Sequence, residues 1–101
     1  FSYDRRYLPT INTETETEKA GAAATAIVGA ENILRDEPPS MGAEDFSWML
    51  NQRPGCYIFI GNGVEGGPGG CYVHNPKYDF NDEILPLGVS YWSRLVEQEL
   101  K

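Results

Sequence analysis

The sequence predicts an α/β protein in which helices pack on a sheet. Segments with the apolar spacing of helices alternate along the chain with short apolar runs that suit strands. Glycine and proline separate these segments. The length of 101 residues suits one small domain with a modest core.

The first two predicted elements are a strand and a helix. Residues 1–7 alternate aromatic and polar side chains, which predicts a half-buried strand. A helix is predicted from Thr13 to Val28, because acidic groups near its start suit the helix dipole and Gly29 is placed to end it. Two pairs have the spacing of a capping box, namely Thr13 with Glu16 and Thr15 with Glu18.

A second helix and a second strand are predicted in the middle of the chain. The helix covers residues 43–52, with Phe46, Met49 and Leu50 on one face. Residues 56–60 form a nearly continuous apolar run next to glycine, which predicts a strand buried on both faces.

The last third predicts a loop, a short strand and a final helix. Residues 61–70 are rich in glycine and form the loop, and residues 71–73 suit the strand. Pro86 fits the first turn of the helix, where proline is tolerated. The apolar stripe of this helix consists of Leu85, Val89, Trp92, Val96 and Leu100, with Leu95 beside it.

Composition excludes several classes of partner. The net charge of -7 repels phosphate backbones, so we expect no nucleic acid. No apolar run approaches the roughly 20 residues that span a bilayer, so we expect no membrane. No basic, apolar signal segment opens the chain, so we expect a cytoplasmic protein. The chain starts at Phe1 inside a predicted strand, so we expect it to be a piece of a longer protein.

The two cysteines predict neither a disulfide nor a zinc site. A disulfide between Cys56 and Cys71 is an alternative, but reduced cytosolic thiols fit the sequence better. Cys71 and His74 have CxxH spacing. Residues three apart on a strand point to opposite faces, and the chain has no second ligand pair, so we predict no self-contained structural zinc site.

Residues 61–66, Gly-Asn-Gly-Val-Glu-Gly, match the dinucleotide pattern GxGxxG. That pattern needs a helix to begin at the third glycine, so that its amide groups meet the pyrophosphate. Residues 67–70 are Gly-Pro-Gly-Gly, which cannot start a helix. We therefore predict no nucleotide site.

Residues 40–46, Ser-Met-Gly-Ala-Glu-Asp-Phe, allow two interpretations. Gly42 lets the backbone approach a ligand, and the free amides of the next helix suit a carboxylate. The simpler interpretation is a plain helix start in which Glu44 and Asp45 complement the dipole. Physical chemistry alone favours the simpler one.

His74, the only histidine, opens the stretch HNPKYDFND. A lone histidine is more often structural than a ligand. Its place after an apolar segment predicts a strand end, where the ligand sites of open α/β sheets gather. Asp79 and Asp82 could orient its second ring nitrogen if it binds a metal.

Four blocks, SMGAEDFSWML, PGCYIFIGNG, HNPKYDFND and LPLGVSYWSRLVEQEL, resemble the C-terminal part of the hippurate hydrolase-type amidohydrolases. These are N-acyl-amino-acid amidohydrolases related to the aminoacylase and carboxypeptidase metallopeptidases. The blocks occur in the order of that family. The stretch YDRRYLPTIN also resembles the segment where the family's inserted lid domain returns to the catalytic domain.

The resemblance implies a fold and an assembly. The chain would be part of an α/β/α sandwich, zinc-peptidase-like catalytic domain, with three helices and a few short strands. Residues 1–12 would end the inserted lid or dimerisation domain, and residues 13–101 would form the C-terminal part of the catalytic domain. The parent protein would be a homodimer.

The resemblance also implies a chemistry. The family binds two divalent metals, zinc or manganese, and a metal-held water deprotonated by a glutamate attacks the amide bond of an N-acyl amino acid. His74 matches the last metal ligand. The substrate-side turn corresponds to Met41, Gly42 and Ala43. Among the neighbours of His74, we expect Asn75 and Asp79 to be its outer partners.

The remaining ligands of the family and its glutamate base have no counterpart in this chain. We therefore expect the chain alone to be inactive, with the rest of the catalytic domain as its partner. Cys71 lies outside the ligand motif. The competing hypotheses are a non-catalytic module of the same fold, which binds a small carboxylate or mediates assembly, and a self-sufficient small domain.

Overall fold

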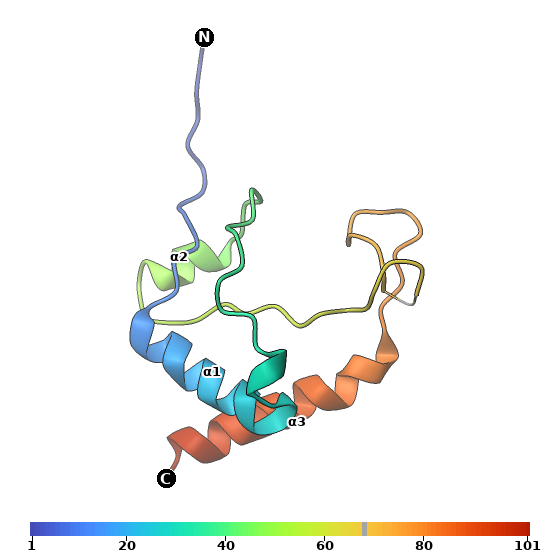
Figure 1. Cartoon of the computed structure of the whole chain (residues 1–101). Helices are drawn as coiled ribbons and strands as arrows, with labels where there is room; N and C mark the ends of the chain where they lie inside the picture. Colours follow the sequence, from blue (N-terminus) through green and yellow to red (C-terminus); the bar gives the residue numbers. More distant parts are fainter. Residues whose placement is uncertain (68) are drawn as a thin grey trace. The chain divides into compact units, whose positions relative to one another are not determined.

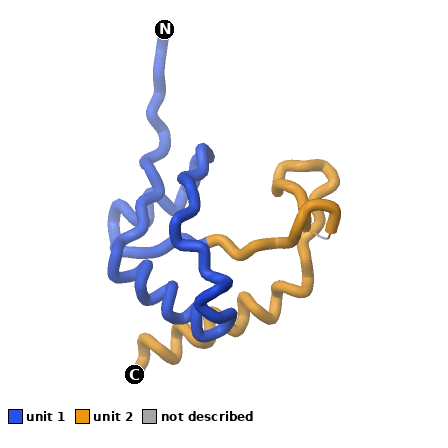
Figure 2. Tube along the Cα trace, viewed as in Figure 1, with its two compact units in different colours: residues 1–58 blue, residues 59–101 orange. Residues whose placement is uncertain are grey.

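The computed structural model describes residues 1–67 and 69–101, and within them three α-helices form (Figure 1). The helices are α1 (Glu14–Val28), α2 (Phe46–Leu50) and α3 (Leu85–Glu99). Two short 3₁₀ helices accompany them, η1 (Ala30–Asn32) after α1 and η2 (Asp82–Ile84) before α3. The chain divides into two compact units, residues 1–58 and residues 59–101 (Figure 2).

No strand or sheet forms in the described residues, so the predicted α/β class and the α/β/α sandwich are wrong for this structure. A strand needs a neighbour whose N–H and C=O groups pair with its own. No strand pairing forms along segments 1–7, 56–60 and 71–73 in the described part of the chain. In the second of them, the backbone groups of Tyr57 pair with the side chain of Asn12 instead.

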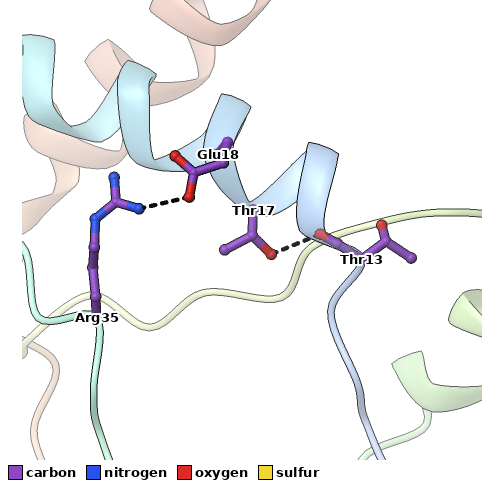
Figure 3. Close-up of polar contacts among 4 residues, drawn as sticks. All are labelled: Thr13, Thr17, Glu18 and Arg35. Carbon is purple, nitrogen blue, oxygen red and sulfur yellow. Dashed lines mark hydrogen bonds and ion pairs between the residues drawn. The ribbon is translucent and has the colours of Figure 1, made fainter.

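Helix α1 begins and ends where the sequence predicts. Thr13 precedes its first residue, and Thr17 Oγ1 donates a 2.8 Å hydrogen bond to the Thr13 carbonyl oxygen (Figure 3). Gly29 ends the helix at φ +84°, a conformation that glycine adopts without steric cost. Ala20 and Ala23 are its buried residues.

One of the two predicted capping pairs is in contact. Thr13 Oγ1 donates a short hydrogen bond to the Glu16 carboxylate, but the hydroxyl accepts no N–H group of the helix, so the reciprocal box does not form. Glu18 pairs with Arg35 at 3.1 Å rather than with Thr15 (Figure 3). Both partners are largely exposed, so this ion pair contributes at most about 1 kcal/mol.

Helix α2 is shorter than predicted and uses a different face. Phe46 and Leu50 are half-buried as expected, but Met49 is 61% exposed. Ser47 is buried instead, and its hydroxyl donates a 2.7 Å hydrogen bond to the Glu44 carbonyl oxygen. A hydroxyl can be buried at this position because that bond satisfies it.

Helix α3 carries Pro86 in its first turn, as predicted, but its apolar stripe faces solvent. Its buried residue is Tyr91, whose ring packs edge-on against Trp92 with centroids 5.3 Å apart. The exposed members of the stripe are Leu85, Val89, Trp92, Val96 and Leu100.

The described part of the chain buries little apolar surface. Its buried residues are Ala20, Ala23, Ser47 and Tyr91. Hydrophobic stabilisation follows the apolar area removed from water, at about 25 cal/mol per Å², so these mostly small side chains contribute little. None of the helices in the described residues has the length and apolar content that crossing a bilayer requires.

Candidate functional site

The Asn-Pro pair after His74 builds a tight turn. The Tyr78 N–H donates a 2.9 Å hydrogen bond to the Asn75 carbonyl oxygen, so Pro76 takes the second position of the turn. Proline is favoured there because its φ is already fixed near the required value. Asn75 Oδ1 also accepts a 2.9 Å hydrogen bond from the Lys77 N–H, which makes the turn an Asx turn.

His74 lies in the turn before this one, which replaces the predicted strand end. The turn is closed by the Asn75 N–H, which donates a 2.8 Å hydrogen bond to the Tyr72 carbonyl oxygen. The His74 side chain is exposed, and no hydrogen bond or ion pair of its ring occurs within the described residues. Within this part of the chain, the imidazole therefore has no hydrogen-bond partner that would compete with a metal ion.

The two expected outer partners of His74 make other hydrogen bonds. The Asn75 side chain closes its own turn. The Asp79 carbonyl oxygen accepts a hydrogen bond from Asn62, and no bond between the Asp79 carboxylate and the His74 ring occurs in the part of the chain described. Their role as outer partners of a metal ligand stays a prediction.

Asn62 joins the glycine-rich loop to the residues that follow the His74 turns. Its Nδ2 donates to the carbonyl oxygens of Gly69 and Asp79, both at 3.3 Å. Its Oδ1 accepts a 3.1 Å hydrogen bond from the Asn81 N–H. One half-buried amide thus holds three backbone groups, and all of them belong to the unit that carries His74.

The predicted substrate-side turn, Met41 to Ala43, is exposed and belongs to the other unit. The Gly42 N–H donates only a long 3.4 Å hydrogen bond to Ser40 Oγ. The N–H groups of Met41 and Ala43 donate no hydrogen bond within the described residues. A Cβ at Gly42 would meet Ser40 Oγ at an ordinary 3.6 Å, so this conformation does not itself require glycine.

Glu44 anchors the end of this turn through both oxygens of its carboxylate. One accepts a 3.1 Å hydrogen bond from the Phe46 N–H, and the other accepts one of 3.1 Å from the Tyr57 hydroxyl. The rings of Phe46 and Tyr57 also pack together, with centroids 5.5 Å apart. The turn is therefore fixed at its C-terminal end and open at Gly42.

These contacts shift three acid–base equilibria. The hydrogen bond from the Phe46 N–H is the main cause that lowers the pKa of Glu44 below its usual 4.5. A hydrogen bond with Glu44, together with repulsion from its charge, raises the pKa of Asp45 above 3.8. The bond to Glu44 also raises the pKa of Tyr57 above 10.0. Glu44 is consequently charged at neutral pH.

The described residues can supply one ligand of a metal site, His74, but not a complete set. No group of three His, Cys, Asp or Glu side chains that could hold a metal ion occurs among them. Zinc takes three or four protein ligands, and His74 supplies one accessible imidazole. Cys56 and Cys71 are half-buried free thiols. A two-metal site that uses His74 therefore needs donors from outside the described residues.

Sequence reasoning missed Asn62 and half of the role of Glu44. An asparagine between two glycines indicates a turn, but nothing in that pattern points to Asp79, 17 residues further on. Glu44 was expected to act on a helix dipole, whereas it also accepts a hydrogen bond from Tyr57, 13 residues away.

Comparison with known proteins relates nearly the whole chain to one group of hydrolases. Residues 1–98 match the peptidase family M20/M25/M40. Hippurate hydrolase from Campylobacter jejuni is 29% identical over 92 residues, which cover 91% of this chain and 23% of the relative. N-acetyldiaminopimelate deacetylase from Streptococcus suis is 30% identical over 93 residues, which cover 92% of this chain and 23% of the relative.

A plant protein matches to the same extent. IAA-amino acid hydrolase ILR1-like 2 from Arabidopsis thaliana is 29% identical over 93 residues, which cover 92% of this chain and 21% of the relative. The chain thus spans less than a quarter of the length of these curated relatives. No solved structure matches the chain.

Proposed function

Because the chain belongs to the peptidase family M20/M25/M40, we propose that it is the C-terminal segment of an amidohydrolase that cleaves the amide bond of N-acyl amino acids. The family is generally metal-dependent. The names of the relatives refer to hippurate, IAA-amino acids and N-acetyldiaminopimelate. Each of these compounds joins an acyl group to an amino acid through an amide, which supports this substrate class.

The proposed role of His74 is to ligate one of two divalent ions, zinc or manganese. The observation that carries it is the accessible imidazole, exposed and without a hydrogen bond of its ring in the described residues. Divalent ions, when bound, would activate a water for attack on the amide and stabilise the negative charge that develops on the carbonyl oxygen. Asn75 and Asp79 would act as outer partners that orient the ring.

The proposed role of Met41, Gly42 and Ala43 is to hold the substrate's carboxylate. Their exposed N–H groups, two of them without a hydrogen bond in the described residues, support this role. The charged Glu44 next to them opposes binding of an anion. A cation that also contacts the substrate would offset this repulsion.

The remaining ligands and the glutamate base are proposed to lie in the rest of the whole protein. Exposed apolar side chains such as Phe59, at 81%, and Trp92, at 62%, support contact with further polypeptide. Residues 1–12 are proposed to end an inserted lid domain in a homodimer. The boundary is supported by residues 1–11, an exposed chain that leads away from α1 (Figure 1).

The test replaces His74 with alanine in the whole protein. We expect His74→Ala to lower the bound zinc or manganese and to reduce hydrolysis of benzoylglycine. The reduction should exceed the 10- to 100-fold loss that is roughly typical when an outer partner of a ligand is removed. Metal content is measured by atomic emission and hydrolysis by release of glycine.

Lys77→Ala is the matched control, because Lys77 is exposed in the same loop and takes part in its turn only through its N–H group. It should leave metal content and hydrolysis unchanged. If His74→Ala behaves like this control, His74 is not a ligand. If the unsubstituted protein binds benzoylglycine without hydrolysing it, the hypothesis of a non-catalytic binding module replaces the enzyme.

A further inference from the structure

We infer that Asn62 is a positioning residue that fixes the loop carrying His74. The inference rests on the proposed function in one respect, since the loop matters for activity only if His74 binds a metal. Asn62 lies in the GxGxxG-like stretch that the proposed function does not otherwise use. Its hydrogen bonds give that stretch a role unrelated to nucleotides.

The side chain of Asn62 holds both ends of one loop. Gly69 and Asp79 flank residues 70–78, and the Asn62 Nδ2 group donates to the carbonyl oxygens of both. Bringing the two ends of a flexible loop together costs conformational entropy, and a single amide bonded to both ends maintains that closure. His74 lies in the middle of the closed loop.

A further bond connects this loop to the start of helix α3. Asn62 Oδ1 accepts a hydrogen bond from the Asn81 N–H. The side chain of Asn81 in turn accepts a 3.2 Å hydrogen bond from the Glu83 N–H and so caps η2, which leads directly into α3. The turns around His74 fix it relative to its neighbours, whereas Asn62 fixes the loop relative to η2.

The glycine at position 69 is explained by the same contact. Gly69 has φ +71°, a backbone conformation that residues other than glycine rarely adopt. A Cβ at Gly69 would also overlap the carbonyl oxygen and the side-chain amide of Asn62. Glycine is therefore required here so that the backbone can approach Asn62.

The experiment compares four variants of the whole protein. Asn62→Ala removes all three hydrogen bonds, and Asn62→Asp keeps the acceptor for Asn81 but removes both donor bonds. Asn12→Ala is the matched control, because it also removes side-chain bonds to distant backbone groups, but in residues 1–58. His74→Ala serves as the reference for loss of the ligand.

The first readout is zinc affinity, measured by competition with a chelator. We expect Asn62→Ala to weaken it by about tenfold, the lower end of the loss seen for partners of metal ligands. Asn62→Asp should fall between Asn62→Ala and the unsubstituted protein, and Asn12→Ala should leave the affinity unchanged. Circular dichroism checks that each variant folds. If Asn62→Ala does not fold, the zinc affinity of Asn62→Asp is compared with that of Asn12→Ala instead.

The second readout is the exchange rate of the Asn81 N–H with solvent, which does not depend on metal. We expect this exchange to accelerate in Asn62→Ala and not in Asn12→Ala. If His74→Ala weakens zinc binding but Asn62→Ala matches Asn12→Ala, positioning by Asn62 is overturned. If His74→Ala leaves zinc binding unchanged, the proposed function fails, and the exchange rate alone then decides whether Asn62 fixes the loop.

Discussion

The side-chain amide of Asn12 pairs with the backbone of Tyr57 as a neighbouring strand would. Asn12 Nδ2 donates a 2.9 Å hydrogen bond to the Tyr57 carbonyl oxygen, and Asn12 Oδ1 accepts a 2.7 Å hydrogen bond from the Tyr57 N–H. Next to this pair, the Thr13 N–H donates to the Gly55 carbonyl oxygen at 3.0 Å. Segments 45 residues apart in sequence are thereby joined without a sheet.

Asn12→Ala should therefore destabilise the unit formed by residues 1–58. It removes two hydrogen bonds that each contribute about 0.5–1.5 kcal/mol net, and their exposure places the total near the lower end, about 1 kcal/mol. The measurement is urea unfolding of the chain, combined with the solvent exchange rate of the Tyr57 N–H. We expect a lower midpoint and faster exchange.

Asn32→Ala provides the comparison for this prediction. Asn32 donates one local bond, at 2.8 Å, to the Val28 carbonyl oxygen, and does not contact Tyr57 by a hydrogen bond. Asn32→Ala should leave the solvent exchange rate of the Tyr57 N–H unchanged. Equal exchange rates at Tyr57 in Asn12→Ala and Asn32→Ala would show that the Asn12 pair does not exist in solution.

Thr13→Ala should cost more than Thr15→Ala, although the two threonines have the same capping-box spacing. Thr13 Oγ1 contacts the Glu16 carboxylate and accepts a 3.0 Å hydrogen bond from the Gly55 N–H. A hydrogen bond of this kind contributes about 0.5–1.5 kcal/mol net, and Thr13→Ala removes both the bond to Glu16 and the bond from Gly55. Thr15 is exposed within α1, so its loss should change stability little.

Thermal unfolding followed by circular dichroism tests this difference. Thr13→Ala should lower the unfolding temperature and the helical signal at 222 nm. Thr13→Ser, which keeps the hydroxyl, should recover most of both. Equal effects of Thr13→Ala and Thr15→Ala would contradict the stabilising role of the Thr13 hydroxyl next to the start of α1.

The contacts of Glu44 predict pKa shifts of opposite direction for two adjacent carboxyl groups, Glu44 and Asp45. The pKa of Glu44 lies below 4.5, so its contribution to stability is present above that pH and is lost as the pH falls through the lowered pKa. The pKa of Asp45 lies above 3.8, so its contribution is present below that pH and is lost as the pH rises through the raised pKa. Titration of the carboxyl carbons followed by NMR measures the pKa of each group.

Tyr57→Phe should move the pKa of Glu44 part of the way back towards 4.5. The substitution removes the hydroxyl that donates to Glu44 and keeps the ring that packs on Phe46. The return is partial because the Phe46 N–H remains the main cause of the shift. Tyr72→Phe, with an exposed ring in the other unit, should leave Glu44 unchanged. A Glu44 that titrates at 4.5 in the unsubstituted chain would refute the contact.

The helices could be predicted from sequence because their signals are local. Gly29 ends α1 through its own backbone conformation, and Pro86 marks the first turn of α3 whatever surrounds it. The burial of α3 could not be predicted in this way. Apolar spacing shows which face of a helix can be covered, but exposed Trp92 shows that the described residues do not cover it.

The strand predictions were wrong, and the hydrogen bonds of Asn12 and Asn62 were missed, for a related reason. Alternation in residues 1–7 and the apolar run at 56–60 describe side chains, whereas a strand depends on pairing of backbone groups with a second segment. Asn12 and Asn62 supply such pairing from side chains, and their partners are far away in sequence. In the candidate site, Asn75 followed by Pro76 is a local signal for the turn that forms there, although we predicted a strand end at His74. The hydrogen bond between Asn62 and Asn81 has no such local signal.

Substitution of two glycines in the same loop distinguishes the clamp at Asn62 from a nucleotide-binding motif. Gly69→Ala forces a left-handed conformation on alanine, which costs about 1–2 kcal/mol, and it also places a methyl group against Asn62. Gly61→Ala meets nothing within 4 Å and should be neutral, or stabilising by up to about 1 kcal/mol, because alanine restricts the unfolded chain. A nucleotide motif would instead make Gly61→Ala the damaging substitution, since Gly61 is its first glycine and position 69 lies outside it.

Urea unfolding gives the stability of both glycine variants, and the exchange rate of the Asn81 N–H reports on the hydrogen bond to Asn62. Faster exchange in Gly61→Ala than in Gly69→Ala would contradict the clamp.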